Sequence, residues 1–213
     1  MLNISLCVDG VWYDAINDLY CIPKKFNVGI AEPKTNYVQV PYRNGSLDMS
    51  EALTGITYKN REIAIPLLIL HPEPLAVYDL VSNRFNGKKC KIRLFESLES
   101  QSEYYYEGRI RVGTLLTNGS KWEFDIFMNA FPFKMRDVLI YVDGATTKSI
   151  TNEGIDTVPT ITVETAMQGT WNGESFTLAV GIHNPHSMVL KTGANALVVA
   201  QGAGKVEFAE KRL

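Results

Sequence analysis

Residues 103–131, EYYYEGRIRVGTLLTNGSKWEFDIFMNAF, decide the fold class. Apolar and polar side chains alternate on both sides of Thr117-Asn118-Gly119-Ser120, and Asn-Gly is a favoured pair for a tight turn between antiparallel strands. The stretch therefore predicts a long β-hairpin. An unpaired edge on such a hairpin would invite strand addition from a neighbouring chain, so the hairpin is a candidate subunit contact.

Further strands are indicated elsewhere in the N-terminal part. A second hairpin is expected around Asp9-Gly10, and a turn is expected at Arg43-Asn44-Gly45-Ser46. Strand patterns of alternating or β-branched residues occur at 3–8, 35–42, 56–70, 88–95 and 137–142.

One helix is expected over about residues 73–86. It opens at Pro72-Glu73-Pro74, where a missing N–H costs little, and it closes at Asn86-Gly87. Helical spacing places four apolar residues on one stripe, which predicts that they face a sheet: Leu75, Tyr78, Val81 and Phe85.

The composition changes at residues 143–158, which are rich in Gly, Thr and Asp. We place a domain boundary there, giving domains 1–145 and 146–213. Short strands are expected in the second domain, separated by glycines, at 159–165, 175–180, 188–191, 197–200 and 205–209. The predicted fold class is mainly β with one helix, in two β-sandwich domains of which the second is smaller.

Charge and hydropathy exclude several functions. The 213 residues carry 21 Lys+Arg and 23 Asp+Glu, a net charge of −2, which gives no electrostatic signature for sequence-specific nucleic-acid binding. The longest apolar run, at 64–70, is far shorter than the roughly 20 residues needed to cross a bilayer, so no membrane insertion is expected. The N-terminus lacks signal-peptide features, which predicts cytoplasmic synthesis. Three widely spaced cysteines predict buried free thiols.

No catalytic, metal or cofactor motif is found, and an enzyme is not expected. His183 and His186 have H-x-x-H spacing without further matching ligands, and Pro185 between them favours a turn. Four glutamates could be interpreted as an acid–base pair for sugar cleavage, but their Ser-rich context favours a solvated loop: Glu96, Glu99, Glu103 and Glu107. Trp171, beside Asn172-Gly173, could stack on a sugar near His183, although a core position is favoured.

An ordered set of motifs resembles the siphophage distal tail proteins. The stretch 41–67, PYRNGSLDMSEALTGITYKNREIAIPL, carries Gly45, Leu47, Asp48, Tyr58 and Arg61 at the positions of the family's signature hairpin and strand. Asn86-Gly87-Lys88 and then Gly108-Arg109 follow in the family's order. In the second part, 152–154, 159–161, 193–197 and 205–208 resemble pieces of the family's galectin-like domain.

The resemblance implies a tail-tube-like β-sandwich or split barrel with one helix, followed by a smaller, galectin-like β-sandwich. It also implies a structural protein of the virion tail tip, made in the bacterial host cytoplasm. Six copies would form a hub ring that joins the tail tube protein to the tail-associated protein, the baseplate and the receptor-binding apparatus. The matched residues would be structural: Gly45 would permit a turn, Asp48 would bond to local backbone, and Tyr58, Arg61 and Arg109 would brace the sheet or a subunit contact. The chain is short for the family, with no room for an inserted carbohydrate-binding module.

The alternative is a carbohydrate-binding protein that acts through the C-terminal, lectin-like domain around Trp171 and His183.

Overall fold

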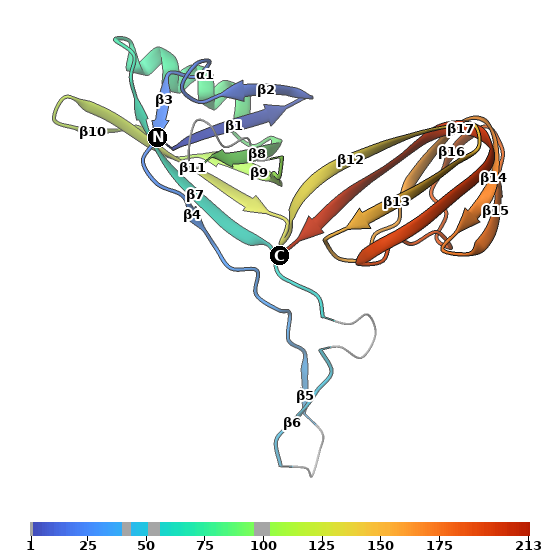
Figure 1. Cartoon of the computed structure of the whole chain (residues 1–213). Helices are drawn as coiled ribbons and strands as arrows, with labels where there is room; N and C mark the ends of the chain where they lie inside the picture. Colours follow the sequence, from blue (N-terminus) through green and yellow to red (C-terminus); the bar gives the residue numbers. More distant parts are fainter. Residues whose placement is uncertain (1, 40–43, 51–55, 96–102) are drawn as a thin grey trace. The chain divides into compact units, whose positions relative to one another are not determined.

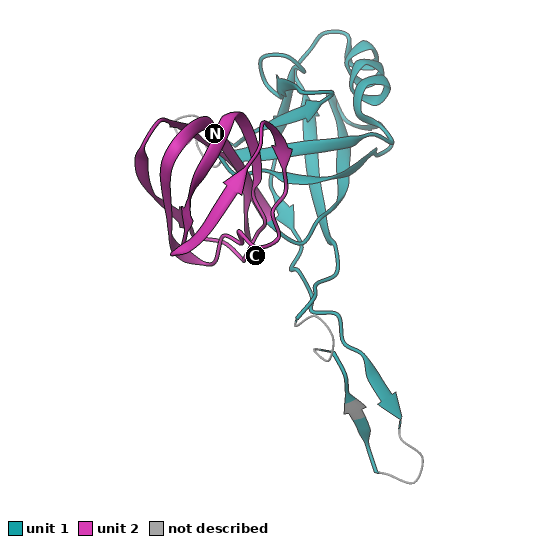
Figure 2. Cartoon of the chain, turned by 90° about the vertical axis from the view of Figure 1, so that its right-hand side faces the viewer, with its two compact units in different colours: residues 1–133 teal, residues 134–213 magenta. Residues whose placement is uncertain are grey.

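The computed structural model describes residues 2–39, 44–50, 56–95 and 103–213. The chain forms two compact units, Met1–Phe133 and Lys134–Leu213 (Figure 2). The second unit begins with β12 (Lys134–Asp143), because this strand pairs with β17 (Gly193–Arg212) along its whole length. The division therefore precedes β12, whereas the sequence placed it after this strand, near residue 145. The Gly- and Thr-rich segment that suggested that boundary begins with the turn into β13 (Thr146–Asn152), inside the second unit.

Unit 1, residues 1–133, holds the only helix in the part of the chain that the structure describes (Figure 1). Its elements are β1 (Asn3–Val8), β2 (Val11–Asp14), β3 (Cys21–Pro23), β4 (Asn27–Val28), β5 (Tyr37–Gln39), β6 (Ser46–Asp48), β7 (Arg61–Ile69), α1 (Pro74–Phe85), β8 (Lys89–Phe95), β9 (Tyr106–Val112), β10 (Leu116–Asn118) and β11 (Lys121–Ala130).

A curled antiparallel sheet forms the body of unit 1. Its strand order is β2-β1-β8-β9-β11-β7-β3, with β10 added to β11 and β4 added to β7. Alternate residues of each strand point to one face, where Ile63, Ile65, Ile110 and Ile126 lie in a buried apolar cluster. The expected hairpins around Asp9-Gly10 and Asn118-Gly119 both form.

The long hairpin lies inside the sheet and not at its edge. β9 pairs with β8 on one side and β11 on the other, and β11 pairs with β7. The expectation of strand addition at this hairpin is therefore wrong over β9. Alternation of side chains shows which residues share a face, but it does not show how many neighbours a strand has.

α1 packs against the sheet with a stripe that differs from the predicted one. Val77, Val81 and Phe85 are buried, whereas Leu75 is 61% exposed. Val77 replaces Leu75 because the spacing of four residues continues through 77, 81 and 85. Tyr78 is partly buried, and its hydroxyl donates to the carbonyl of Gly113 at 3.0 Å.

In unit 2, residues 134–213, two long strands each pair with two shorter strands, one after the other along the length of the long strand. β13 continues the pairing of β12 on β17, while β15 (Glu174–Leu178) and β16 (Gly181–His183) pair successively with β14 (Thr160–Trp171). β14 and β17 also pair with each other, with register shifts between Val163 and Gly169. The pairing of β14 with β17 is therefore irregular in this region, and the residues of unit 2 that face inward form a second apolar cluster.

The strands of unit 2 are longer than the sequence predicted. Gly169, Gly202 and Gly204 were expected to separate short strands, but they lie inside β14 and β17. A Cβ atom at Gly202 would lie 2.4 Å from the carbonyl oxygen of Ala166, and φ is +103°. Glycine is needed there because two backbones approach closely at the bend, not because the chain turns back.

A buried carboxylate stabilises the end of β17. Glu210 is fully buried and accepts hydrogen bonds from Arg136 Nη2 at 2.7 Å and from Arg212 Nε at 2.6 Å. Two guanidinium partners compensate for the loss of solvation that burial imposes on the charge.

The expected mainly β class with one helix is confirmed. No described helix has the length and hydropathy of a membrane span.

Candidate interaction surfaces

The signature stretch of the sequence forms part of an arm, which we define as the described residues 29–39, 44–50 and 56–60. The arm continues the pairing of β4 with β7. The N–H of Gly29 donates to the carbonyl of Glu62 at 2.8 Å, and the N–H of Lys59 donates to the carbonyl of Glu32 at 2.8 Å. Farther along, β5 pairs with β6 (Figure 1). The arm is therefore a ribbon of two antiparallel segments.

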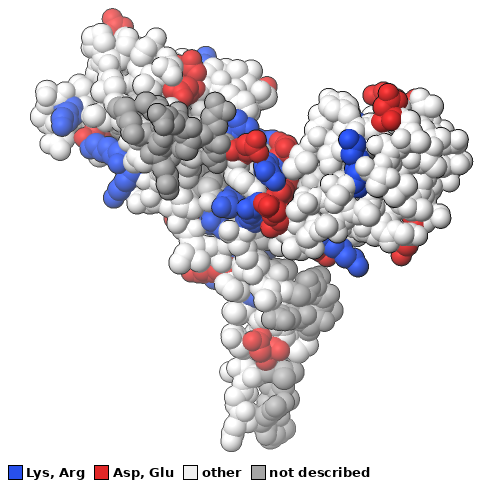
Figure 3. Space-filling view, viewed as in Figure 1, with Lys and Arg blue, Asp and Glu red and all other residues white. Residues whose placement is uncertain are grey.

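Apolar side chains on the arm are exposed. Ile30 is 86% exposed, Tyr37 59% and Ile56 54%, and Val38 and Met49 are also exposed. Figure 3 shows that the described arm surface is mostly uncharged. A two-stranded ribbon has no second layer to cover these side chains. Exposed apolar groups gathered on one segment make the arm a candidate interaction surface.

Gly45, Leu47 and Asp48 lie together in the β5–β6 hairpin of the arm. Gly45 has φ +82°, which supports its expected role in the turn. Asp48 accepts hydrogen bonds from the N–H of Ser50 at 2.9 Å and from the Ser50 hydroxyl. These bonds, the hydroxyl first, lower the pKa of Asp48. The Ser50 hydroxyl also accepts from the N–H of Asn36 at 2.8 Å, so the Asp48–Ser50 pair links both segments of the ribbon.

Tyr58 and Arg61 lie at the base of the arm and contact the end of unit 1. The Tyr58 ring meets Phe133 edge-on, with 5.9 Å between the ring centroids. Arg61 is 8% exposed; its Nη2 donates to the carbonyl of Pro132, and its guanidinium lies 5.3 Å from the centroid of Tyr106. Both residues therefore contact unit 1 where the arm leaves the sheet.

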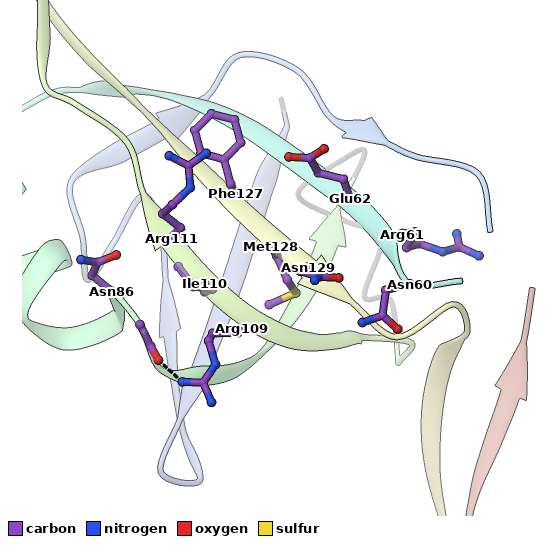
Figure 4. Close-up of a pocket in the computed structure, with 11 residues that line it drawn as sticks. Asn60, Arg61, Glu62, Asn86, Arg109, Ile110, Arg111, Phe127, Met128 and Asn129 are labelled. Atoms are coloured by element: carbon purple, nitrogen blue, oxygen red, sulfur yellow. Dashed lines mark hydrogen bonds between the residues drawn. The ribbon is translucent and has the colours of Figure 1, made fainter. Parts of the chain in front are cut away.

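A hollow of about 800 Å³ lies on unit 1 over β7, β9 and β11 (Figure 4). Four of the motif residues border it, although the sequence separates them by up to 48 positions: Arg61, Asn86, Gly87 and Arg109. In Figure 4, Arg61 points away from the hollow.

Backbone contacts explain why these motif residues are suited to their positions. Gly87, with φ +77°, donates its N–H to the carbonyl of Ile110 at 2.8 Å, and its own carbonyl accepts from Arg109 Nη1. Asn86 Oδ1 accepts from the N–H of Val112 at 3.0 Å. The end of α1 is thereby attached to β9.

Gly108 provides the close approach of β9 to β11. A Cβ atom at this position would lie 2.3 Å from the carbonyl oxygen of Asn129 and 2.6 Å from Cα of Ala130. No side chain fits there without backbone movement.

Other residues of the hollow were not singled out from the sequence, among them Arg111, Phe127 and Asn129. The guanidinium of Arg111 lies 4.3 Å from the centroid of Phe127. The signal available was the alternation Arg109-Ile110-Arg111, in which Ile110 enters the core and both arginines face outward. Phe127 and Asn129 lie on β11, and the alternation within β9 could not show that they are neighbours of the two arginines.

The residues of the alternative hypotheses are placed as follows. Glu96 and Glu99 lie outside the described residues. Glu107 forms an ion pair with Lys89. In the described part of the chain, no three His, Cys, Asp or Glu side chains are grouped to hold a metal ion.

Trp171 does not offer a ring to a sugar. It is 3% exposed within the core of unit 2, and its indole N–H donates to the carbonyl of Val189 at 3.2 Å. His183 Nε2 lies 2.7 Å from the carbonyl oxygen of Ala179. This burial does not agree with a sugar-stacking role for Trp171. A turn motif in the sequence does not show whether a neighbouring ring is covered in the folded protein.

No protein-family model matches the sequence, and no curated protein matches it significantly. Solved structures do match. The SPP1 Dit protein, described as a paradigm of the hub of the adsorption apparatus in phages that infect Gram-positive bacteria, is 15% identical with a TM-score of 0.61 and 99% of each chain covered. A chain of the phage P2 baseplate in its activated conformation with Ca is 8% identical with a TM-score of 0.50, covering 100% of this chain and 98% of the other. Over nearly its whole length, the chain has the fold of a phage hub protein, in agreement with the resemblance that its ordered motifs carry.

Proposed function

We propose that the protein is a non-enzymatic structural component of a phage or prophage tail tip, where six copies form a hub ring. The ring joins the tail tube protein to the tail-associated protein, the baseplate and the receptor-binding apparatus. The shared fold supports a tail-tip role, and the ordered motifs support the ring and its partners.

The arm is the observation that carries the proposal. Its exposed apolar side chains, Ile30, Tyr37 and Ile56 among them, require cover that unit 1 itself does not provide. In a cyclic assembly each copy uses one surface to contact the next copy and a different surface to receive the previous one. An arm that continues from one end of the sheet supplies the first kind of surface.

Light scattering coupled to size exclusion tests the proposal. The wild-type protein is expected as an assembly of six chains of 23.8 kDa each. Changing Ile30 and Ile56 together to serine should shift the population toward smaller species, because two apolar contacts per interface are lost. A double change of Leu75 and Leu116 to serine is the matched control, since both leucines are exposed outside the arm.

Two outcomes would contradict the proposal. A strictly monomeric wild-type protein at high concentration that also fails to bind tail tube protein argues against a hub ring. An assembly that the arm variant and the control variant disturb equally argues against contact through the arm.

A further inference from the structure

Two arginines of β9 border the hollow of unit 1. Arg109 and Arg111 occupy alternate positions of β9, both exposed on the face opposite the core. Neither forms an ion pair with a carboxylate among the residues that the structure describes. By contrast, the neighbouring Lys89 pairs with Glu107.

Both guanidinium groups are held in place by the protein. Arg109 Nη1 donates to the carbonyl of Gly87, and Arg111 stacks on the ring of Phe127 (Figure 4). A side chain that is already ordered loses less conformational entropy when it binds a ligand. A guanidinium also keeps several N–H donors after one of them is engaged, and its planar fork matches a carboxylate.

The rest of the hollow favours a polypeptide over a nucleic-acid duplex. Asn129 pairs in register with Arg109 on one side and Glu62 on the other, so a carboxylate lies two strands from the guanidinium. A phosphate backbone is negatively charged at every nucleotide and would meet that carboxylate, whereas a peptide can place an uncharged residue there. Carboxamides, including those of Asn60 and Asn129, also line the hollow and can bond to peptide groups. The volume of about 800 Å³ suits several side chains.

We propose that this hollow docks an extended, acidic segment of a partner protein, whose carboxylates pair with Arg109 and Arg111. Residues two apart along a strand are separated by about 6.6 Å. An extended segment with acidic residues at alternate positions repeats the spacing of these two backbone positions, so it can present a carboxylate to each arginine. The inference goes beyond the ring assembly and does not depend on it.

Calorimetry with synthetic peptides on the full chain tests the proposal. One peptide carries glutamate and threonine at alternate positions, and a second has the same composition with all glutamates in one block. The alternating peptide is expected to bind several-fold more tightly. Changing Arg109 or Arg111 to glutamine should weaken its binding roughly tenfold each, because one charge-assisted contact is lost.

Lys121→Gln is the matched control, since it removes one positive charge from β11 outside the hollow. It should leave the affinity unchanged. Thermal unfolding of each variant shows whether the Arg109 change disturbs the sheet, and Arg111→Gln tests the site without affecting the bond to Gly87.

Several results would overturn the proposal. They are the absence of peptide binding at millimolar concentration, equal affinity for the two peptides, and equal weakening by Lys121→Gln. Binding of a short DNA duplex or inorganic phosphate that depends on both arginines, with no peptide binding, would assign the hollow to another class of anion and refute the docking of an acidic segment.

Discussion

Replacing Trp171 by alanine separates the structural role of this residue from a sugar-binding role. The side chain is 3% exposed in the core of unit 2. A buried aromatic side chain removes about 150–250 Å² from water, and at about 25 cal/mol per Å² this corresponds to roughly 4–6 kcal/mol. The change also leaves the carbonyl of Val189 without the indole donor, which costs about 1 kcal/mol.

Because the methyl group of alanine retains part of the buried area, we expect a loss of about 4–5 kcal/mol in the free energy of unfolding, within the usual range for buried aromatic residues. That is a large share of the roughly 5–15 kcal/mol that stabilises a small domain. Trp171→Phe, the matched control, keeps a buried ring and should cost about 1–2 kcal/mol.

Hydrogen exchange followed by mass spectrometry measures the two units separately. For the alanine variant, the most protected amides of β14 and β17 should lose about three orders of magnitude of protection, while amides of unit 1 provide the internal reference. A loss of less than tenfold would refute the burial of Trp171. If sugar binding disappeared while exchange stayed unchanged, the ring would have to contact a ligand.

Other predictions concern stability and thiol reactivity. Glu210→Gln should cost about 2–4 kcal/mol in chemical denaturation, because it leaves two guanidinium groups without their shared carboxylate; an unchanged midpoint would contradict this. Gly108→Ala should destabilise unit 1 by about 1–3 kcal/mol in a thermal scan, and wild-type stability would show that β9 can shift freely. Burial raises the pKa of Cys21 to about 12 and, as the largest cause, that of Cys90 to about 11. Because both folded values exceed the ordinary thiol value of 9.0, this contribution to stability is full below pH 9 and is lost as the pH rises from there through 11 and 12. A thiol reagent at pH 8 should label both residues only after unfolding.

Local patterns in the sequence were enough to locate the hairpins and the helix. Asp9-Gly10 and Asn118-Gly119 mark turns because their backbone preferences hold in any context. The same patterns failed where neighbours decide the outcome. Leu75 has helical spacing relative to Tyr78, yet the sheet covers Val77 instead.

The gathering of motif residues also depends on tertiary structure. The order of Arg61, Asn86 and Arg109 along the chain indicated a family resemblance, but their common position around one hollow follows from the pairing of β7 with β11 and of β11 with β9. The arm likewise matched the signature stretch by sequence, whereas the exposure of Ile30 and Ile56 is a property of the folded ribbon.

The sequence by itself determined a mainly β chain with one helix and no recognisable catalytic motif, because alternation, turn residues and motifs act over a few positions. Only the tertiary structure decided that Trp171 is covered, that Gly202 lies inside a bent strand, and that Arg109 and Arg111 border one hollow, where neither forms an ion pair with a described carboxylate. The physical reason is that burial and charge compensation depend on which distant segments pack together, and periodicity along the chain does not specify those neighbours.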